Sequence, residues 1–271
     1  MTHILEKSEI GGWIILDGVV LPEEQAFLSC KDSGMLLGCT VFDSFVVHDG
    51  KVVGLTMHLQ RLAQSASSVG FKCPTERKLR QELGLLLDHC QGSFRVRITL
   101  TEGGCRMIWA QAFQRDRIHR SVTAAMCPHP GFMFLPGWVK HGSRFGSTFE
   151  KKRRNVDVLL YTDASGRFME GCTAGIVAER DGVLYSAPHS KDILPSVTVQ
   201  SLVARAARTN VPWRWEAPDS SECWDAIYVA SSGRDIAPVS SLDGLRRKSW
   251  GSAGKTLAAS WSPLDGEAIR Q

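Results

Sequence analysis

Aspartate–glycine pairs end several short apolar runs of this chain, and this pattern limits the possible folds more than any other feature. Asp17-Gly18 follows the run Trp13–Leu16, and Asp49-Gly50 follows the β-branched and aromatic run Val41–Val47. Asp-Gly between two strands favours a tight hairpin, because both residues accept backbone angles that most residues avoid. A third pair, Asp181-Gly182, separates two further apolar runs. The sequence therefore predicts several antiparallel hairpins.

Segments with helical spacing lie between the expected strands, so the sequence predicts an α/β (α+β) fold. Residues 52–55 are expected to form a strand. Thr56 is expected to cap the helix that follows, which ends at Gly70 and has five apolar residues on one face: Leu59, Leu62, Ala63, Ala66 and Val69. Pro74-Thr75-Glu76 is expected to open a second helix, and Ser196–Arg208 is expected to form a third.

The most polar stretch in the middle of the chain begins at Gln114, and it predicts a linker between two domains. The N-terminal domain is then residues 1–113, the linker residues 114–119, and the C-terminal domain residues 120–271. Residues 127–146 are rich in proline and glycine. A loop of about 20 residues inside a compact domain is often functional. The basic run Lys151–Arg154 is interpreted as a solvated turn or helix end, rather than as a nucleic-acid site.

Composition favours an ordinary globular protein. Of the 271 residues, 43% are hydrophobic and 22% are charged, which argues against disordered, collagen-like and coiled-coil chains. A membrane-spanning helix needs about 18 consecutive apolar residues, and the sequence contains no such run, so no membrane association is expected. Met1–Lys7 lacks a basic cluster followed by an apolar stretch, so no secretory signal is expected.

The eight cysteines are scattered, with no C-x-x-C pair and no zinc-type spacing. In a chain of this length without an expected signal, scattered cysteines are typical of reduced, packed thiols. The sequence therefore predicts a cytosolic (cytoplasmic) protein without a metal site.

Two basic side chains are candidates for binding chemistry. Lys140 lies in the proline- and glycine-rich stretch beside Trp138, His141 and Arg144, where neighbouring cations and partial burial favour a nucleophilic amine. Arg61 flanks the apolar stripe of the first expected helix, from which a guanidinium can reach a phosphate. On these residues alone, an ordinary surface lysine and a snorkelling arginine remain open as alternatives.

Two further features suggest an anionic ligand and a charged partner. Leu194–Thr198 precedes an expected helix, and the first N–H groups of a helix bind phosphate readily. Glu170 lies beside apolar residues at the end of an expected strand, where a carboxylate needs a cation such as a protonated ring nitrogen. A plain Ser196 cap and a solvent-facing glutamate are the alternatives.

Together, the order of these motifs resembles the fold-type IV (class IV) pyridoxal-phosphate-dependent aminotransferase family. This class contains branched-chain aminotransferases, D-amino-acid aminotransferases and aminodeoxychorismate lyases. The resemblance covers nearly the whole chain and rests on these segments in family order: Gly38–Asp43, Asp49–Lys51, His58–Leu62 with Ser65-Ala66, Val139–His141, Asp163–Gly166, Glu170-Gly171, Asp181–Leu184, Leu194–Thr198, Ser231-Ser232 and Pro238-Val239.

The resemblance implies a role for each matching residue. Lys140 is similar to the lysine that binds the aldehyde of pyridoxal 5'-phosphate (PLP) as a Schiff base and moves the substrate α-proton. Glu170 is similar to the carboxylate that keeps the pyridine nitrogen protonated. Arg61, Val197, Thr198 and Ser232 are similar to the residues that hold the phosphate. Phe42, Arg97 and Arg144 are implied to contact the substrate.

The resemblance also implies an architecture and an assembly. It implies a two-domain fold-type IV PLP enzyme, with a smaller N-terminal α/β domain and a larger C-terminal pseudo-barrel domain. It implies a homodimer that acts on small-molecule amino and oxo acids, with neither nucleic acid nor membrane as a partner.

The leading predicted function is a class IV transaminase, which moves an amino group between an amino acid or amine and a 2-oxo acid. The segment Lys140–Arg144 resembles the Lys-His-x-x-Arg run of aminodeoxychorismate lyases, so a lyase that releases pyruvate is the alternative. A non-catalytic member that binds a phosphorylated ligand is a third possibility, because Leu37, Phe145, Gly175 and Ser196 depart from the residues usual in the family.

Overall fold

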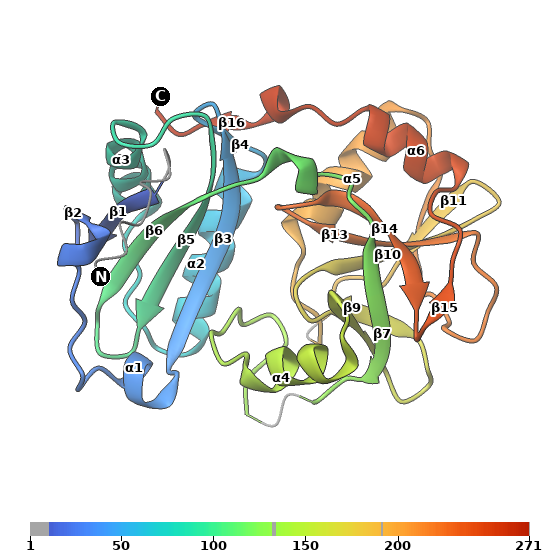
Figure 1. Cartoon of the computed structure of the whole chain (residues 1–271), viewed down its shortest axis with the longest axis horizontal. Helices are drawn as coiled ribbons and strands as arrows, with labels where there is room; N and C mark the ends of the chain where they lie inside the picture. Colours follow the sequence, from blue (N-terminus) through green and yellow to red (C-terminus); the bar gives the residue numbers. More distant parts are fainter. Residues whose placement is uncertain (1–10, 132–133, 191, 271) are drawn as a thin grey trace, which may run out of the picture. The chain divides into compact units, whose positions relative to one another are not determined.

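The computed structural model describes residues 11–131, 134–190 and 192–270, which form two compact units (Figure 1). Unit 1 combines the described residues up to Arg115 with Lys140–Ser143 and those from Pro263 on; unit 2 is Asp116–Val139 and Arg144–Ser262. The boundaries 1–113, 114–119 and 120–271 stay a prediction. Met1–Lys7, on which the expectation of no secretory signal rests, lies outside the described residues.

The described residues of unit 1 contain one seven-stranded sheet in the order β16-β4-β3-β5-β6-β1-β2. Both predicted Asp-Gly hairpins of this unit are confirmed, because Asp17 and Asp49 have positive φ angles at the turns between β1 and β2 and between β3 and β4. The strands are β1 (Gly11–Leu16), β2 (Val19–Pro22), β3 (Thr40–His48), β4 (Lys51–Val52), β5 (Ser93–Thr101), β6 (Arg106–Ala112) and β16 (Glu267–Ala268).

The pairing of β3 with β5 decides which side chains share a face. In this antiparallel pair Phe42 lies opposite Thr99 and Asp43 lies opposite Ile98. Successive residues of a strand point to opposite faces. Asp43 therefore lies on the same face as the buried Ile98, and Phe42 lies on the other face.

Helices α2 (Leu55–Ser68) and α3 (Glu76–Leu87) cover the Ile98 face of this sheet (Figure 1), and the short helix α1 (Ser33–Leu37) precedes β3. The predicted start of α3 is confirmed, since the Thr75 hydroxyl accepts from the N–H of Lys78.

The start of α2 differs from the prediction in two ways. Gly54, with φ +70°, turns the chain into the helix, so Leu55 is helical rather than part of a strand. Thr56 is not the cap; its hydroxyl donates to Glu267. The predicted apolar face is also wrong at Ala63, which is exposed. The buried face of α2 is shifted from the predicted one and includes three polar residues: His58, Arg61 and Ser65.

The described part of unit 2 contains a nine-stranded mixed sheet in the order β12-β11-β10-β13-β14-β7-β8-β9, with β15 paired to β14. The strands are β7 (Val122–Pro128), β8 (Val158–Thr162), β9 (Phe168–Gly171), β10 (Gly175–Arg180), β11 (Val183–Ser186), β12 (Trp213–Trp215), β13 (Ala226–Ser231), β14 (Asp235–Leu242) and β15 (Leu245–Arg246).

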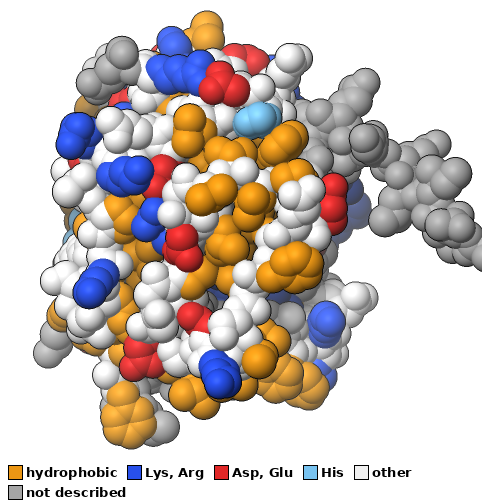
Figure 2. Space-filling model, turned by 90° about the vertical axis from the view of Figure 1, so that its left-hand side faces the viewer, with side chains coloured by type: hydrophobic (Ala, Val, Ile, Leu, Met, Phe, Trp, Pro, Cys, Tyr) orange, Lys and Arg blue, Asp and Glu red, His pale blue; other side chains and the backbone are white. Residues whose placement is uncertain are grey.

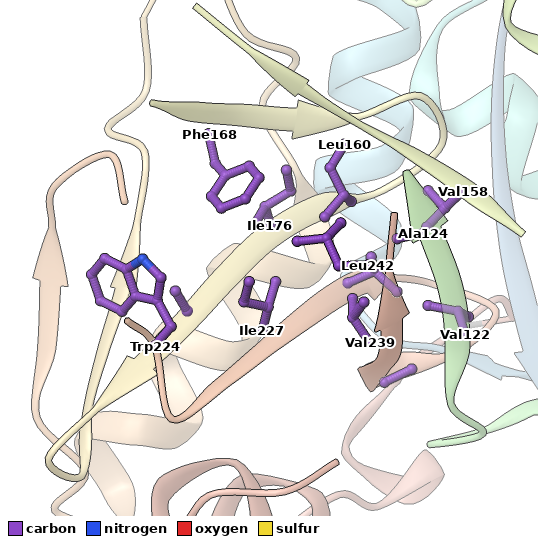
Figure 3. Close-up of a cluster of buried hydrophobic side chains, with 13 residues drawn as sticks. Val122, Ala124, Val158, Leu160, Phe168, Ile176, Trp224, Ile227, Val239 and Leu242 are labelled. Atoms are coloured by element: carbon purple, nitrogen blue, oxygen red, sulfur yellow. The ribbon is translucent and has the colours of Figure 1, made fainter. Parts of the chain in front are cut away.

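Both faces of the central strands of this sheet are buried. Ile227 and Val229 of β13 belong to one apolar cluster with Phe168 and Leu160 (Figure 3), whereas Tyr228 between them belongs to a second cluster with Leu202. This alternation explains why the sequence of β13 is apolar throughout, since a strand buried on both faces has no polar side.

Three helices belong to unit 2: α4 (Phe145–Arg154), α5 (Val197–Arg208) and α6 (Ser252–Ala259). The predicted cap of α5 is confirmed, because Ser196 Oγ accepts from the N–H of Val199 at 3.3 Å. The basic run Lys151–Arg154 forms the last turn of α4, as the helix-end interpretation predicted. The start of α4 at Phe145 was not predicted; α4 buries none of its residues, and its two phenylalanines, Phe145 and Phe149, are exposed.

None of the helices in the described part of the chain combines the length and the apolar composition needed to cross a membrane. The eight cysteines all lie within the described ranges, and each has a free thiol, as predicted.

Candidate active site

Lys140 is fixed to the edge of β3 in unit 1. The N–H of Phe42 donates to the Lys140 carbonyl, and the N–H of Gly142 donates to the Thr40 carbonyl, each at 2.9 Å. The N–H of Lys140 donates to Ser65 Oγ of α2 at 3.0 Å. A Cβ at Gly142 would overlap the Thr40 hydroxyl, so only glycine allows this close approach. The backbone of Lys140 is therefore held on two sides.

Arg61 lies one turn before Ser65 on α2 and forms a buried ion pair with Asp43 of β3. Arg61 Nε donates to Asp43 Oδ2 at 2.7 Å, and Arg61 Nη2 donates to Oδ1 at 2.9 Å. Asp43 is 0% exposed. Burial by itself raises the pKa of Asp43, but the charges and hydrogen bonds of Arg61 and His58 lower it well below its usual range. Asp43 is therefore an anion that holds one edge of the guanidinium.

His58 completes this buried group. Its Nδ1 lies 2.8 Å from Asp43 Oδ1, and because the carboxylate is an acceptor, we assign the ring proton to Nδ1. Burial lowers the pKa of His58. The nearby cations Arg61 and Lys140 also lower this pKa, whereas Asp43 raises it. His58 is therefore neutral, and its buried Nε2 has no hydrogen-bond partner among the residues that the structure describes.

Phe42 and Arg97 lie on the opposite face of the sheet from Asp43. The guanidinium carbon of Arg97 is 3.7 Å from the centre of the Phe42 ring, and Lys140 Nζ is 5.0 Å from the same centre. Arg97 Nε also donates to Thr99 Oγ1 at 3.1 Å. Unit 1 thus presents Arg61 on one face, Phe42 with Arg97 on the other, and Lys140 at the sheet edge.

In unit 2, Glu170 lies on β9 near a histidine that the sequence analysis did not identify. His129 Nε2 is 4.0 Å from Glu170 Oε1. The N–H of Gly131 donates to His129 Nδ1 at 3.0 Å, so the ring proton is on Nε2, which faces the carboxylate. His129 follows β7 in an irregular stretch, where no periodic pattern in the sequence could indicate its neighbour.

Arg144 lies in the same part of unit 2. Its Nη1 donates to the Cys172 carbonyl at 3.1 Å. Burial lowers the pKa of Arg144, and the nearby groups of Cys172, Tyr161 and Glu170 oppose this shift. Burial raises the pKa of Tyr161 to about 12, so its phenol stays protonated at neutral pH. Arg144 is therefore a partly buried cation that interacts electrostatically with the carboxylate of Glu170.

The start of α5 is fixed on two sides within unit 2. Gly175 of β10 packs so closely against Ser196 and Val199 that a Cβ would clash with the helix. Arg205 of α5 donates to both carboxylate oxygens of Asp235 at 2.7 Å, and Asp235 pairs with Ser231 at the base of the hairpin that contains Ser232. These contacts connect the helix to that hairpin.

The predicted site residues are thus divided between the two units. Arg61, Lys140, Phe42 and Arg97 belong to unit 1, whereas Glu170, Arg144, Val197, Thr198 and Ser232 belong to unit 2. In the first turn of α5, the N–H groups of Val197 and Thr198 have no acceptor within the helix. The first group offers an amine and two guanidinium cations, and the second offers a carboxylate and a helix start.

Solved structures with the same architecture support the predicted fold class. The branched-chain amino acid aminotransferase of Escherichia coli matches with a TM-score of 0.81 and 18% identity, over 91% of this chain and 92% of that one. The branched-chain aminotransferase of Thermobaculum terrenum in its PLP form also has a TM-score of 0.81 and 18% identity, over 93% of each chain. These likenesses confirm the predicted fold type IV.

The sequence comparisons agree with this fold. D-alanine aminotransferase of Staphylococcus aureus is 22% identical in an alignment of 253 residues that covers 85% of this chain and 89% of that protein. A model of the family described as amino-transferase class IV matches residues 40–242, well over half of the 271 residues. The predicted family and enzyme class are therefore confirmed, and the chain belongs to the class IV aminotransferases.

Proposed function

We propose that this protein is a PLP-dependent aminotransferase that moves an amino group between an amino acid or amine and a 2-oxo acid. One observation within unit 1 supports this most strongly. Lys140 is bonded through its N–H to Ser65 of α2, and Arg61 lies one turn earlier on the same helix. A single helix thus fixes both an amine suited to an aldehyde and a cation suited to a phosphate.

The donor groups of the two units fit the chemistry of PLP. The phosphate carries nearly two negative charges, for which Arg61, the N–H groups of Val197 and Thr198, and Ser232 are the proposed ligands. Glu170 is the proposed partner of the pyridine nitrogen. Bound to Lys140 as a Schiff base, PLP would supply an electron-withdrawing ring next to the substrate α-carbon.

The chain's own residues then have separate tasks. Lys140 Nζ is proposed to take the proton from the substrate α-carbon and return it to the cofactor side, which one flexible amine can do. The cation of Arg97 stacks on Phe42, whose ring centre is also 5.0 Å from Lys140 Nζ, and this supports a role of Arg97 in binding the substrate carboxylate. Arg144 is proposed as a third residue on the substrate side.

A homodimer in the cytoplasm, acting on small-molecule amino and oxo acids, is part of the proposal. Figure 2 shows hydrophobic side chains gathered on one face, with charged side chains around them. Three successive apolar residues of α1 are also largely exposed: Met35, Leu36 and Leu37. Exposed apolar surface of this kind marks protein interfaces more often than free surface.

The test uses the purified full-length chain with PLP and a screen of amino donors. We expect an absorption band near the visible edge that each accepted donor removes, and amino transfer that requires a 2-oxo acid. Lys140→Ala should abolish the band and the transfer, whereas the control Lys152→Ala, at an exposed position of α4, should keep both. A band that survives in Lys140→Ala, or product formed without any acceptor, would contradict the proposal.

A further inference from the structure

Unit 1 contains two arginine–carboxylate pairs with the same forked geometry and a buried carboxylate; Arg61 is buried, whereas Arg106 is partly exposed. Arg61 donates through Nε and Nη2 to the two oxygens of Asp43, and Arg106 donates through Nε and Nη2 to the two oxygens of Glu82. Asp43 is 0% exposed and Glu82 is 1% exposed. Since the two pairs have the same chemistry, their different neighbours indicate what each one does.

The Asp43–Arg61 pair is next to the helix turn that holds Lys140. Ser65 of α2, one turn after Arg61, accepts the N–H of Lys140, and the N–H of Phe42, the residue before Asp43, donates to the Lys140 carbonyl. The Glu82–Arg106 pair instead joins α3 to the first residue of β6. Only the first pair therefore shares its supports with the proposed catalytic lysine.

The geometry of the pair fixes the direction in which Arg61 can bind an anion. A guanidinium is planar and has five N–H donors, so engaging Nε and Nη2 fixes the plane of the whole group. His58 fixes the carboxylate in turn, because its Nδ1 donates to Asp43 Oδ1. The orientation of the other N–H groups of Arg61 is set by the plane that Asp43 imposes.

We propose that Asp43 is a positioning residue for phosphate recognition: it holds Arg61 in the one orientation in which the guanidinium can bind the cofactor phosphate. This inference rests on the proposed PLP function. Asp43 touches neither phosphate nor substrate in this proposal, and it acts only through Arg61. A purely structural role would be shared by Glu82, whose buried carboxylate holds the partly exposed Arg106 with the same fork.

The experiment compares two ligands that differ only in the phosphate. The full-length chain is titrated with PLP and with pyridoxal. The dissociation constant of pyridoxal divided by that of PLP is the ratio that measures phosphate recognition. Arg61→Met should remove most of this preference for PLP. Asp43→Asn should lower the ratio by about tenfold, because charge-assisted hydrogen bonds of the guanidinium then lose their orientation. Binding of pyridoxal should change little.

Glu82→Gln is the matched control. It removes a carboxylate from the same kind of fork, so it should destabilise the fold as Asp43→Asn does, while leaving the ratio unchanged. In the double variant Asp43→Asn, Arg61→Met, the ratio should equal that of Arg61→Met alone, since Asp43 acts only through Arg61. A further decrease in the double variant would overturn the proposal.

Asp43→Glu covers the case in which Asp43→Asn does not fold. It keeps the negative charge but moves the carboxylate by one methylene group, so the ratio should fall by several-fold while the pair remains charged. A wild-type ratio in either folded Asp43 variant, or an equal decrease in Glu82→Gln, would overturn the proposal. A wild-type chain that binds neither PLP nor pyridoxal would instead refute the proposed function and this inference with it.

Discussion

Helices α2 and α3 cover the same face of one sheet, yet their buried faces differ. α3 buries Leu79, Leu83 and Leu86 and one charged residue, Glu82, which Arg106 neutralises. α2 buries a similar apolar stripe and, beside it, three polar residues: His58, Arg61 and Ser65. Burying polar groups destabilises a fold unless they are paired. Both helices therefore pack through an apolar stripe, and the additional polar stripe of α2 carries the proposed chemistry.

The largest expected effect comes from removing the arginine of each forked pair. Arg61→Met and Arg106→Met each remove the forked cation of a buried carboxylate. The loss of unfolding free energy should be about 3–5 kcal/mol for Arg61→Met and smaller for Arg106→Met, because Lys78 Nζ remains 3.6 Å from Glu82 Oε1. Only Arg61→Met should also weaken PLP binding. Urea unfolding and PLP titration of both variants check this, and equal loss of PLP binding would remove the distinction between the helices.

The apolar stripes should behave alike. Leu62→Ala in α2 and Leu83→Ala in α3 each create a cavity at a fully buried position, with an expected loss of about 3 kcal/mol in unfolding free energy. If the stripe of α2 serves only packing, folded Leu62→Ala protein should keep the wild-type preference for PLP over pyridoxal. Thermal unfolding and the same titration measure the two effects, and a loss of preference would show that packing and recognition are coupled.

A smaller difference is expected for two hydroxyl groups. Ser65→Ala leaves the N–H of Lys140 without its acceptor, and Thr75→Ala removes the cap of α3; each should cost about 1 kcal/mol. Ser65→Ala should lower kcat, because Lys140 loses one of its two supports, whereas Thr75→Ala should leave kcat unchanged. Steady-state kinetics with one accepted donor decides between them.

The smallest expected effect is a pH dependence that α3 lacks, since α3 contains no histidine. Burial lowers the pKa of His58 in the folded state, so the unfolded chain binds more protons between pH 5 and 7. The stability contribution of neutral His58 is therefore present above about pH 6.5 and is lost as the pH falls. In the wild-type protein the unfolding free energy should decrease as the pH is lowered. In His58→Gln this decrease should be smaller, by less than about 1 kcal/mol per pH unit. Urea unfolding at pH 7.5, 6.5 and 5.5 measures the slope, and an equal slope in both proteins would contradict this prediction.

Local patterns predicted most elements of the fold. The Asp-Gly turns and the helix starts at Thr75 and Ser196 depend on neighbouring residues, and these predictions are confirmed. Helix α4 was not predicted because it buries no residue, and the start of α2 was wrong because a left-handed Gly54 replaces the expected Thr56 cap.

The site was predictable in its parts but not in its contacts. Arg61, Lys140 and Glu170 came from motifs that resemble a family, and their roles stay proposals. The fork between Asp43 and Arg61 and the bond from Lys140 to Ser65 join residues that are distant in sequence. No periodicity encodes such pairs, because the sheet register and the helix position together determine them.

The membership of Lys140–Ser143 in unit 1 has a consequence for synthesis on the ribosome. The strand edge at Thr40 and Phe42 stays open until residues 140–142 have been translated, and β4 lacks its neighbour β16 until residues 267–268 follow. Unit 1 therefore completes its sheet only after unit 2 has been translated. Any nascent chain that stalls in between displays an unpaired strand edge, which is a surface that chaperones bind and that other chains can join.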